Sequence, residues 1–250
     1  NASNIEKDWN WISIQNTMGA ELSNISENLS LIAVQGPKAV ELLQNYTDLN
    51  LSAIKFYHFQ KGTFAGYNDI IISATGYTGS GGFELYVPNS YAVEIWDLIF
   101  SSGSKYNVLP TGLAARDTLR LEMGYCLYGN DINDHTSPIS AGLSWVTKFN
   151  KEFIGKEIIQ NHKLQGTQNK LVAFELLERG IPRKDYEITN ADGKLIGKVT
   201  SGTMGPSVRK AIGMGYVNSN FSNFGNSIFI NIRNKSIPAK IVKLPFFKIE

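Results

Sequence analysis

The sequence predicts a mixed α+β region followed by a small β-barrel or β-sandwich. Up to about residue 165, amphipathic segments of helical length alternate with short apolar runs that are typical of strands. From Leu171 onward, short β runs follow one another and are separated by Gly, Asn, Asp and Pro. The texture changes in the polar stretch from Asn161 to Asn169. We therefore expect two domains, residues 1–165 and residues 166–250.

Helix ends place the helices of the α+β region. Ser3 and Glu6 form a capping box, Pro37 suits a first helical turn, and Ser90 is a capping residue. Glycines mark several helix ends. In chain order we expect a helix from Ser3 or Asn4 to about Gly19, a strand at Leu29–Val34, a helix from Pro37 to Tyr46, strand and turn over Phe56–Phe64, strands at Asp69–Ala74 and Phe83–Val87, a helix from Ser90 to Gly103, and a helix from about Thr111 to Met123.

Six short apolar runs predict the strands of the second domain. A hairpin turn is expected from Asn190 to Gly193, because Asn, Asp and Gly favour the tight turns that join neighbouring strands. The predicted strands are Leu171–Leu177, Tyr186–Thr189, Leu195–Thr200, Ala211–Val217, Ser227–Ile232 and Ala239–Val242.

The composition is that of an ordinary globular protein, with 42% hydrophobic and 18% charged residues. The 24 basic and 22 acidic residues are spread along the chain, so no basic block predicts binding to nucleic acid or to a membrane surface. No apolar run is long enough to span a membrane. The single cysteine, Cys126, excludes an internal disulfide and fits a reducing compartment. The three scattered histidines predict no metal site.

A glycine-rich loop with a carboxylate at its end is the most distinctive stretch of the chain. The stretch from Thr75 through Gly82 contains four glycines, which predicts a tight loop because glycine adopts positive φ and allows close approach. Glu84 lies one residue inside the strand that follows, and Tyr77 belongs to the loop. Two interpretations fit: a hairpin whose Glu84 faces water, or a binding site anchored by Glu84.

Arg116 and Arg120 lie four residues apart on the last helix expected in the α+β region, so they share a face and repel each other unless an acidic group intervenes. Asp117 is three residues from Arg120 and can pair with it. Arg116 is then expected either to be solvated on the helix surface or to contact Glu84 or an acidic or carbonyl-bearing ligand.

Motifs along the whole chain resemble those of the T-protein of the glycine cleavage system, and they occur in the order that the family has. They are Gly76-Tyr-Thr-Gly79 with Gly82-Phe-Glu84, Gly112 to Glu122, Leu127 to Asp131 with His135-Thr136, Phe153 to Glu157, Ser201 to Ser207, and Lys243 to Phe247. Each motif is weak evidence by itself, and together they identify the family.

The resemblance implies a folate-binding α+β region followed by a C-terminal β-barrel. It implies an aminomethyltransferase that receives an aminomethyl group on the dihydrolipoyl arm of a lipoyl-bearing H-protein. The one-carbon unit then passes to tetrahydrofolate, the co-substrate, and ammonia is released. Such an enzyme is expected in the cytoplasm, or in the mitochondrial matrix if the source is eukaryotic.

The resemblance also implies the site residues. Glu84 matches the folate-binding glutamate of the family, Tyr77 and Arg116 match pocket residues around it, and Asn1 matches an asparagine that contacts the pterin. Lys248 stands where some members carry an arginine that meets the glutamate tail of folate. A carboxylate suits a pterin because it accepts hydrogen bonds from a ring N–H and an amino group side by side.

The catalytic aspartate of the family has no match in this chain. In the family it belongs to an Asp-Asp-Leu or Asp-Asp-Met run in the N-terminal section. Asp69-Ile-Ile is not that run, because it lies on the strand that enters the glycine loop. The catalytic residue is therefore unassigned, and we expect the chain to be N-terminally incomplete, without the catalytic acid and part of the folate pocket.

Three other functions are compatible with the same scaffold. A folate-dependent demethylase of a methylated sulfur or amine substrate would share the Glu84 pocket, although the motif from Leu127 to Ile132 favours the transferase. A non-enzymatic folate-binding factor of iron–sulfur assembly would carry a cysteine where this chain has Glu152. The third is a non-catalytic folate-binding fragment. Cys126 is expected to be a small core residue and not a nucleophile.

Overall fold

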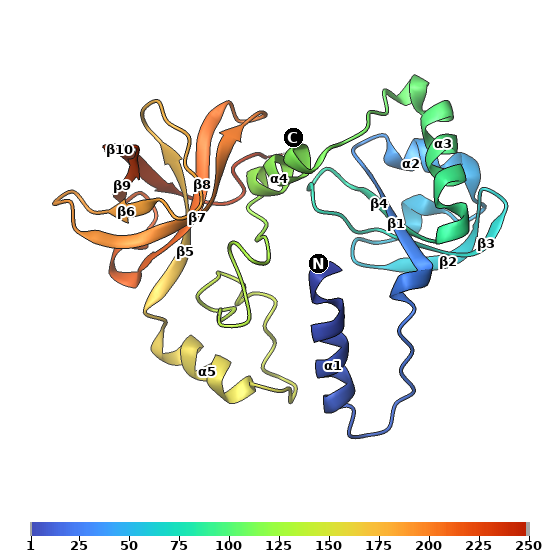
Figure 1. The fold of residues 1–250 in the computed structure, drawn as a ribbon, viewed down its shortest axis with the longest axis horizontal. Coiled ribbons are helices and arrows are strands. Elements are labelled where there is room, and N and C mark those ends of the chain that lie inside the picture. Colours follow the sequence, from blue (N-terminus) through green and yellow to red (C-terminus); the bar gives the residue numbers. More distant parts are fainter. Residues whose placement is uncertain (1, 249–250) are drawn as a thin grey trace. The chain divides into compact units, whose positions relative to one another are not determined.

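The computed structural model describes residues 2–248, and the chain divides into two compact units, Asn1–Thr111 and Gly112–Glu250 (Figure 1). Residues 112–165 group with the barrel because the helix Leu113–Glu122 packs against the strand Leu195–Gly205. The boundary between the two compact units therefore lies before the point where the sequence changes to short β runs. The expected domain division at 165/166 stays a prediction.

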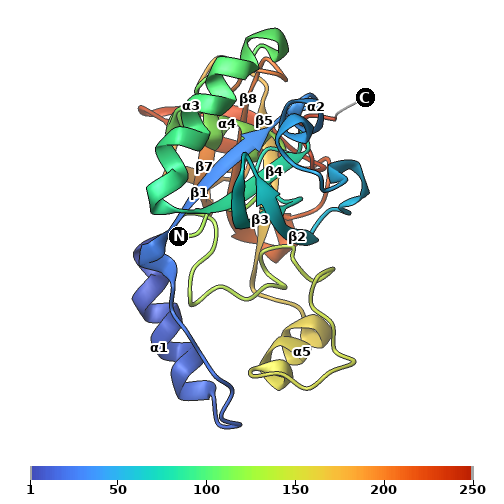
Figure 2. The same ribbon diagram turned by 90° about the vertical axis from the view of Figure 1, so that its right-hand side faces the viewer.

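Unit 1 is built on a four-stranded antiparallel sheet. Its elements are α1 Ile5–Gln15, β1 Leu29–Gln35, α2 Ala39–Leu43, β2 Phe59–Phe64, β3 Tyr67–Ser73, β4 Gly82–Pro88 and α3 Ala92–Gly103. The strand order is β1-β4-β3-β2. Figures 1 and 2 show α2 and α3 on the same face of this sheet, and one apolar core lies between the helices and the strands. The opposite face of the sheet is not part of this core.

The alternation of β4 decides which side chains face the core. Phe83, Leu85 and Val87 are at most 3% exposed and point into the core. Glu84 and Tyr86 alternate with them and lie on the opposite face of the sheet. The strand that the sequence predicts at Phe83–Val87 is thus confirmed.

Unit 2 contains a closed six-stranded barrel, which confirms the barrel fold and all six predicted strands. Its elements are α4 Leu113–Glu122, α5 Lys156–Gln165, β5 Asn169–Leu176, β6 Glu187–Thr189, β7 Leu195–Gly205, β8 Lys210–Asn218, β9 Ser227–Ile232 and β10 Lys235–Val242. The order around the barrel is β10-β5-β8-β7-β6-β9. The predicted hairpin turn joins β6 to β7, and the Gly193 N–H donates to the Asn190 carbonyl at 3.0 Å. Inward-facing residues such as Phe174 and Ile188 fill the barrel.

Three expectations about helices were wrong in detail. The first helix ends at Gln15 instead of Gly19, and its N-cap, Asn4, makes no side-chain capping bond. Ser90 does not cap α3, because it lies within the preceding 3-10 turn. Helix α5 was not expected at all. None of its residues is buried, so no apolar stripe marks it in the sequence.

Candidate functional site

Glu84 lies in the middle of the open face of the unit 1 sheet and is half-buried. Its neighbours on the adjacent strands are Ala33 of β1 and Ser73 of β3. Residues directly opposite each other on paired strands point to the same face, so these small side chains leave room above the carboxylate. The carboxylate can therefore meet a ligand that lies on the sheet.

The surface around Glu84 is apolar and aromatic. Tyr86 follows it on the same face and is half-buried, while Leu31 and Phe59 of the flanking strands are 49% and 64% exposed. Burial, and then the negative charge of Glu84, raise the pKa of Tyr86. The phenol therefore stays neutral and can act as a donor. One carboxylate within an apolar, aromatic surface fits a flat heterocycle that carries N–H donors, as a pterin does.

A short chain of hydroxyl groups holds the Glu84 carboxylate. The Thr75 hydroxyl donates a hydrogen bond to Oε2 of Glu84. Ser73 Oγ, which is buried, lies 3.0 Å from Thr75 Oγ1. A hydroxyl has one hydrogen, and a carboxylate only accepts, so Thr75 donates to Glu84 and accepts from Ser73. The orientation of the carboxylate is set by residues of β3 and the glycine loop.

Gln35 ties the glycine loop to β1. Its Nε2 donates to the carbonyl oxygens of Thr75 at 3.1 Å and Phe83 at 3.3 Å, and its Oε1 accepts from the Thr78 hydroxyl at 3.0 Å. A Cβ added at Gly76 would lie 1.8 Å from Gln35 Oε1, so a larger residue there would displace the Gln35 amide from these bonds. Gln35 thus connects the predicted tight loop to a neighbouring strand.

The other predicted site residues are divided between the two units. Tyr77 is half-buried in the glycine loop of unit 1, together with Glu84 at its end. Arg116 is exposed on α4, and Lys248 is exposed near the end of unit 2. Asn1 lies outside the described residues. The structure therefore brings Tyr77 and Glu84 into one hairpin, and the roles of all five residues stay predictions.

Arg120 forms a buried network that sequence reasoning identified only in part. The predicted pair with Asp117 is present, at 2.6 Å from Nη2 to Oδ1. The guanidinium also donates to Oδ2 of Asp131 at 2.8 Å and to Ser201 Oγ at 2.9 Å, and its side chain is 1% exposed. Asp131 in turn accepts from the Leu127 N–H and the Ser201 hydroxyl. The network joins α4, the loop after it and β7.

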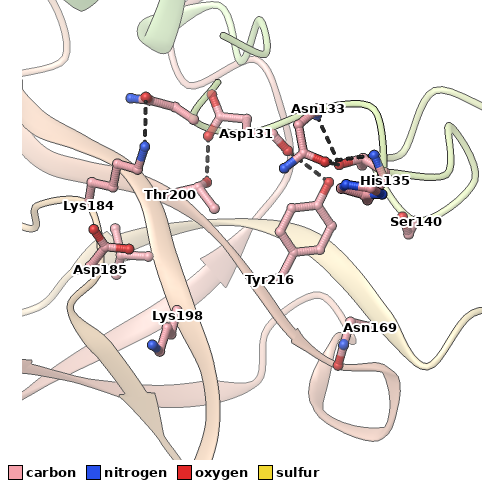
Figure 3. A pocket seen from close by; sticks show the side chains of 13 residues that line it. Asp131, Asn133, His135, Ser140, Asn169, Lys184, Asp185, Lys198, Thr200 and Tyr216 are labelled. Carbon is pink, nitrogen blue, oxygen red and sulfur yellow. Dashed lines mark hydrogen bonds between the residues drawn. The ribbon is translucent and has the colours of Figure 1, made fainter. Parts of the chain in front are cut away.

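An open pocket of about 450 Å³ lies next to this network in unit 2 (Figure 3). Its lining includes the polar side chains of Asn133, His135, Lys184, Lys198 and Tyr216. The Lys184 ammonium donates to the carbonyl of Gly129 at 2.9 Å. The Tyr216 hydroxyl donates to the backbone carbonyl of Asp131 at 2.9 Å. These bonds hold the 129–131 loop against the barrel.

Two groups beside the pocket are kept neutral. Burial, and then the negative charges of Cys126 and Asp131, raise the pKa of Tyr216 to about 12. Burial, with the negative charge of Asp131, raises the pKa of the Cys126 thiol to about 11 in spite of the opposing charge of Arg120. A thiol with such a pKa is a poor nucleophile at neutral pH. This agrees with the expectation that Cys126 has no nucleophilic role.

The described residues also hold features that the sequence analysis missed. Thr75 bonds to Glu84, Ser73 bonds to Thr75, and Gln35 bonds to the backbone of Thr75 and Phe83. Of these contacts, the sequence offers a local signal for the bond between Thr75 and Glu84. A threonine at the start of the loop is placed to reach the strand on the other side of the hairpin. In the sequence, Asp131 is the last residue of the Leu127–Asp131 motif, and nothing there indicates that it is the partner of Arg120.

Neither a metal cluster nor a membrane span is found in residues 2–248. No group of three or more His, Cys, Asp or Glu side chains is arranged to hold a metal ion there. No helix in the same range is long and apolar enough to cross a membrane.

Two family profiles together match nearly the whole chain. Residues 1–151 match the GCVT N-terminal domain, and residues 169–248 match the glycine cleavage T-protein C-terminal barrel domain. The second match coincides with the closed barrel of unit 2.

Curated relatives and a solved structure agree with these profiles. An aminomethyltransferase of Flavobacterium psychrophilum is 57% identical over 248 residues, covering 99% of this chain and 69% of the relative. An aminomethyltransferase of Bacteroides fragilis is 55% identical over 250 residues, with the same coverage of 99% and 69%. The crystal structure of glycine cleavage system aminomethyltransferase T from Bartonella henselae is similar with a TM-score of 0.87 and 32% identity, over 99% of this chain and 67% of that chain.

Proposed function

The chain belongs to the glycine cleavage T-protein family of aminomethyltransferases, and we propose that it binds tetrahydrofolate on the open face of the unit 1 sheet, with Glu84 as the anchor. The bound folate accepts the one-carbon unit of an aminomethyl group that a lipoyl-bearing H-protein delivers. Ammonia and the reduced lipoyl arm are the other products.

The environment of Glu84 is the observation that supports this function. Thr75 occupies one lone pair of Oε2, which leaves the rest of the carboxylate for a ligand. A pterin presents a ring N–H and an amino group side by side, so it can donate to both carboxylate oxygens. Each such hydrogen bond to a charged acceptor is worth about 1.5–3 kcal/mol. The aromatic surface around Glu84 suits the flat faces of the pterin ring.

Four further residues are proposed to complete the folate site. Tyr77 and Arg116 contact the bound pterin or its linker, and Asn1, outside the described residues, donates to the pterin. Lys248 is exposed and cationic, which suits the carboxylates of the glutamate tail. No residue of the chain is assigned as the catalytic acid, and metal ions have no proposed role.

The proposed partners follow from the reaction. The carrier is a lipoyl-bearing protein, because the aminomethyl group must be covalently attached to a mobile arm. The relatives are bacterial, and we place the protein in the cytoplasm. Nucleic acid and membranes have no part in this function.

Ammonia release tests the function. The protein is assayed with an aminomethylated lipoyl carrier and tetrahydrofolate together, and again with each of the two omitted. We expect ammonia release only when both are present. Rapid methyl transfer from a sulfonium or a simple methylamine, without the carrier, would contradict the proposal and favour a demethylase.

A further inference from the structure

The Glu84 side chain is held by the hydroxyl group of Thr75, and Gln35 in turn holds the glycine loop to which Thr75 belongs. The Thr75 hydroxyl donates to Oε2 of Glu84 and accepts from Ser73. A free glutamate side chain samples many rotamers, and fixing it on binding reduces affinity. Because Thr75 is bonded to Oε2 in the protein itself, part of this ordering is complete before a ligand arrives.

The backbone of Thr75 is fixed by the same residue that fixes the backbone next to Glu84. Gln35 donates from a single amide nitrogen to the carbonyl oxygens of Thr75 and Phe83. Phe83 directly precedes Glu84 in the chain, so the donor hydroxyl and the acceptor carboxylate are held on one common support. This arrangement needs a glycine at position 82, where φ is 122° and a Cβ would lie only 2.3 Å from the Val34 carbonyl oxygen.

We propose that Thr75 is a positioning residue for folate binding, which presents the Glu84 carboxylate in the rotamer that accepts both pterin donors. The inference rests on the function proposed above. Thr75 acts through Glu84: its hydroxyl bonds to Oε2, and the remaining lone pairs of the carboxylate stay available to a ligand. Gln35 supports the arrangement by holding the loop.

The test compares Thr75→Val, which removes the hydroxyl and keeps the shape, with Thr75→Ser, which keeps the hydroxyl. The Kd for tetrahydrofolate is measured for both by calorimetric titration of the whole chain. We expect Thr75→Val to raise Kd about tenfold and Thr75→Ser to restore binding to within about threefold of the parent chain. Thr63→Val is the matched control, because Thr63 is exposed on β2 and bonds to Asn68 instead of Glu84.

A Glu84→Gln arm separates the failure of this inference from the failure of the function. If Glu84→Gln binds folate as well as the parent chain, the folate site itself is misplaced. If Glu84→Gln loses binding while Thr75→Val keeps it, only the positioning role is wrong. Equal losses in Thr75→Ser and Thr75→Val would also overturn the positioning role, since the hydroxyl would then have no part in binding. The melting temperature of each variant shows whether it is folded.

Discussion

Nη1 of Arg120 lies 2.8 Å from Oδ2 of Asp131, and the exposed fractions of the two side chains are 1% and 0%. Each charge is taken out of water, so each depends on the other and on the further groups around it. Arg120 also donates to the Asp117 carboxylate, the Ser201 hydroxyl and the Tyr125 carbonyl. Together with Ser201 of β7, this pair connects α4 and its following loop to the barrel.

Removing one member of this pair is expected to be costly. Arg120→Met leaves the Asp131 carboxylate buried without its cation, so the free energy of unfolding should fall by about 3–5 kcal/mol. Lys210→Met is the matched control, because the Lys210–Glu175 pair at 2.7 Å has a 57% exposed lysine and should be worth less than about 1 kcal/mol. Urea unfolding followed by circular dichroism measures both. If both variants lost the same free energy of unfolding, the buried pair would contribute no more to stability than the exposed one.

Thr189 offers a stabilising substitution in the barrel. Among the described residues, its Oγ1 is a buried side-chain atom without a hydrogen-bond partner, and such an atom costs about 1–3 kcal/mol. Thr189→Val keeps the shape and removes the hydroxyl, so the melting temperature should rise. The same change at Thr200, whose hydroxyl bonds to Asp131, should lower it. A fall in melting temperature at Thr189 would mean that its hydroxyl has a partner.

Cys126 should react slowly with alkylating reagents in the folded protein. Its pKa of about 11 means that at pH 8 only about a hundredth as much thiolate is present as in an ordinary cysteine. The rate of iodoacetamide modification should therefore be at least about a hundredfold below that of the urea-unfolded chain, and should still be rising between pH 9 and pH 11. The chain has one cysteine, so the intact mass reports this site alone. A rate that levels off near pH 8 would contradict the raised pKa.

The sequence predicted best what depends on neighbouring residues. The alternation of Phe83 to Val87 predicts both the strand and the direction of Glu84, because strand side chains alternate between faces. The turn from Asn190 to Gly193 likewise follows from local turn chemistry. Helix α5 was not predicted, because none of its residues is buried and its sequence has no apolar stripe at helical spacing.

The contacts that escaped prediction join residues far apart in the chain. Arg120 reaches Ser201, 81 residues away, and Gln35 reaches Thr75, 40 residues away. No periodicity relates such positions, so only the folded chain brings them together. The same limit explains why Glu84 was proposed from its motif, whereas the hydroxyl that holds it was not.

The central claim is that the Glu84 carboxylate anchors tetrahydrofolate, and a single comparison tests it most directly. Calorimetric titration of tetrahydrofolate into Glu84→Gln replaces a charged double acceptor by a neutral amide of the same shape. Glu41→Gln, an exposed glutamate on α2, is the control. We predict that Glu84→Gln weakens binding by about 3 kcal/mol, or roughly 150-fold, while Glu41→Gln leaves it unchanged. A folded Glu84→Gln variant that binds tetrahydrofolate as tightly as the parent chain would contradict the claim.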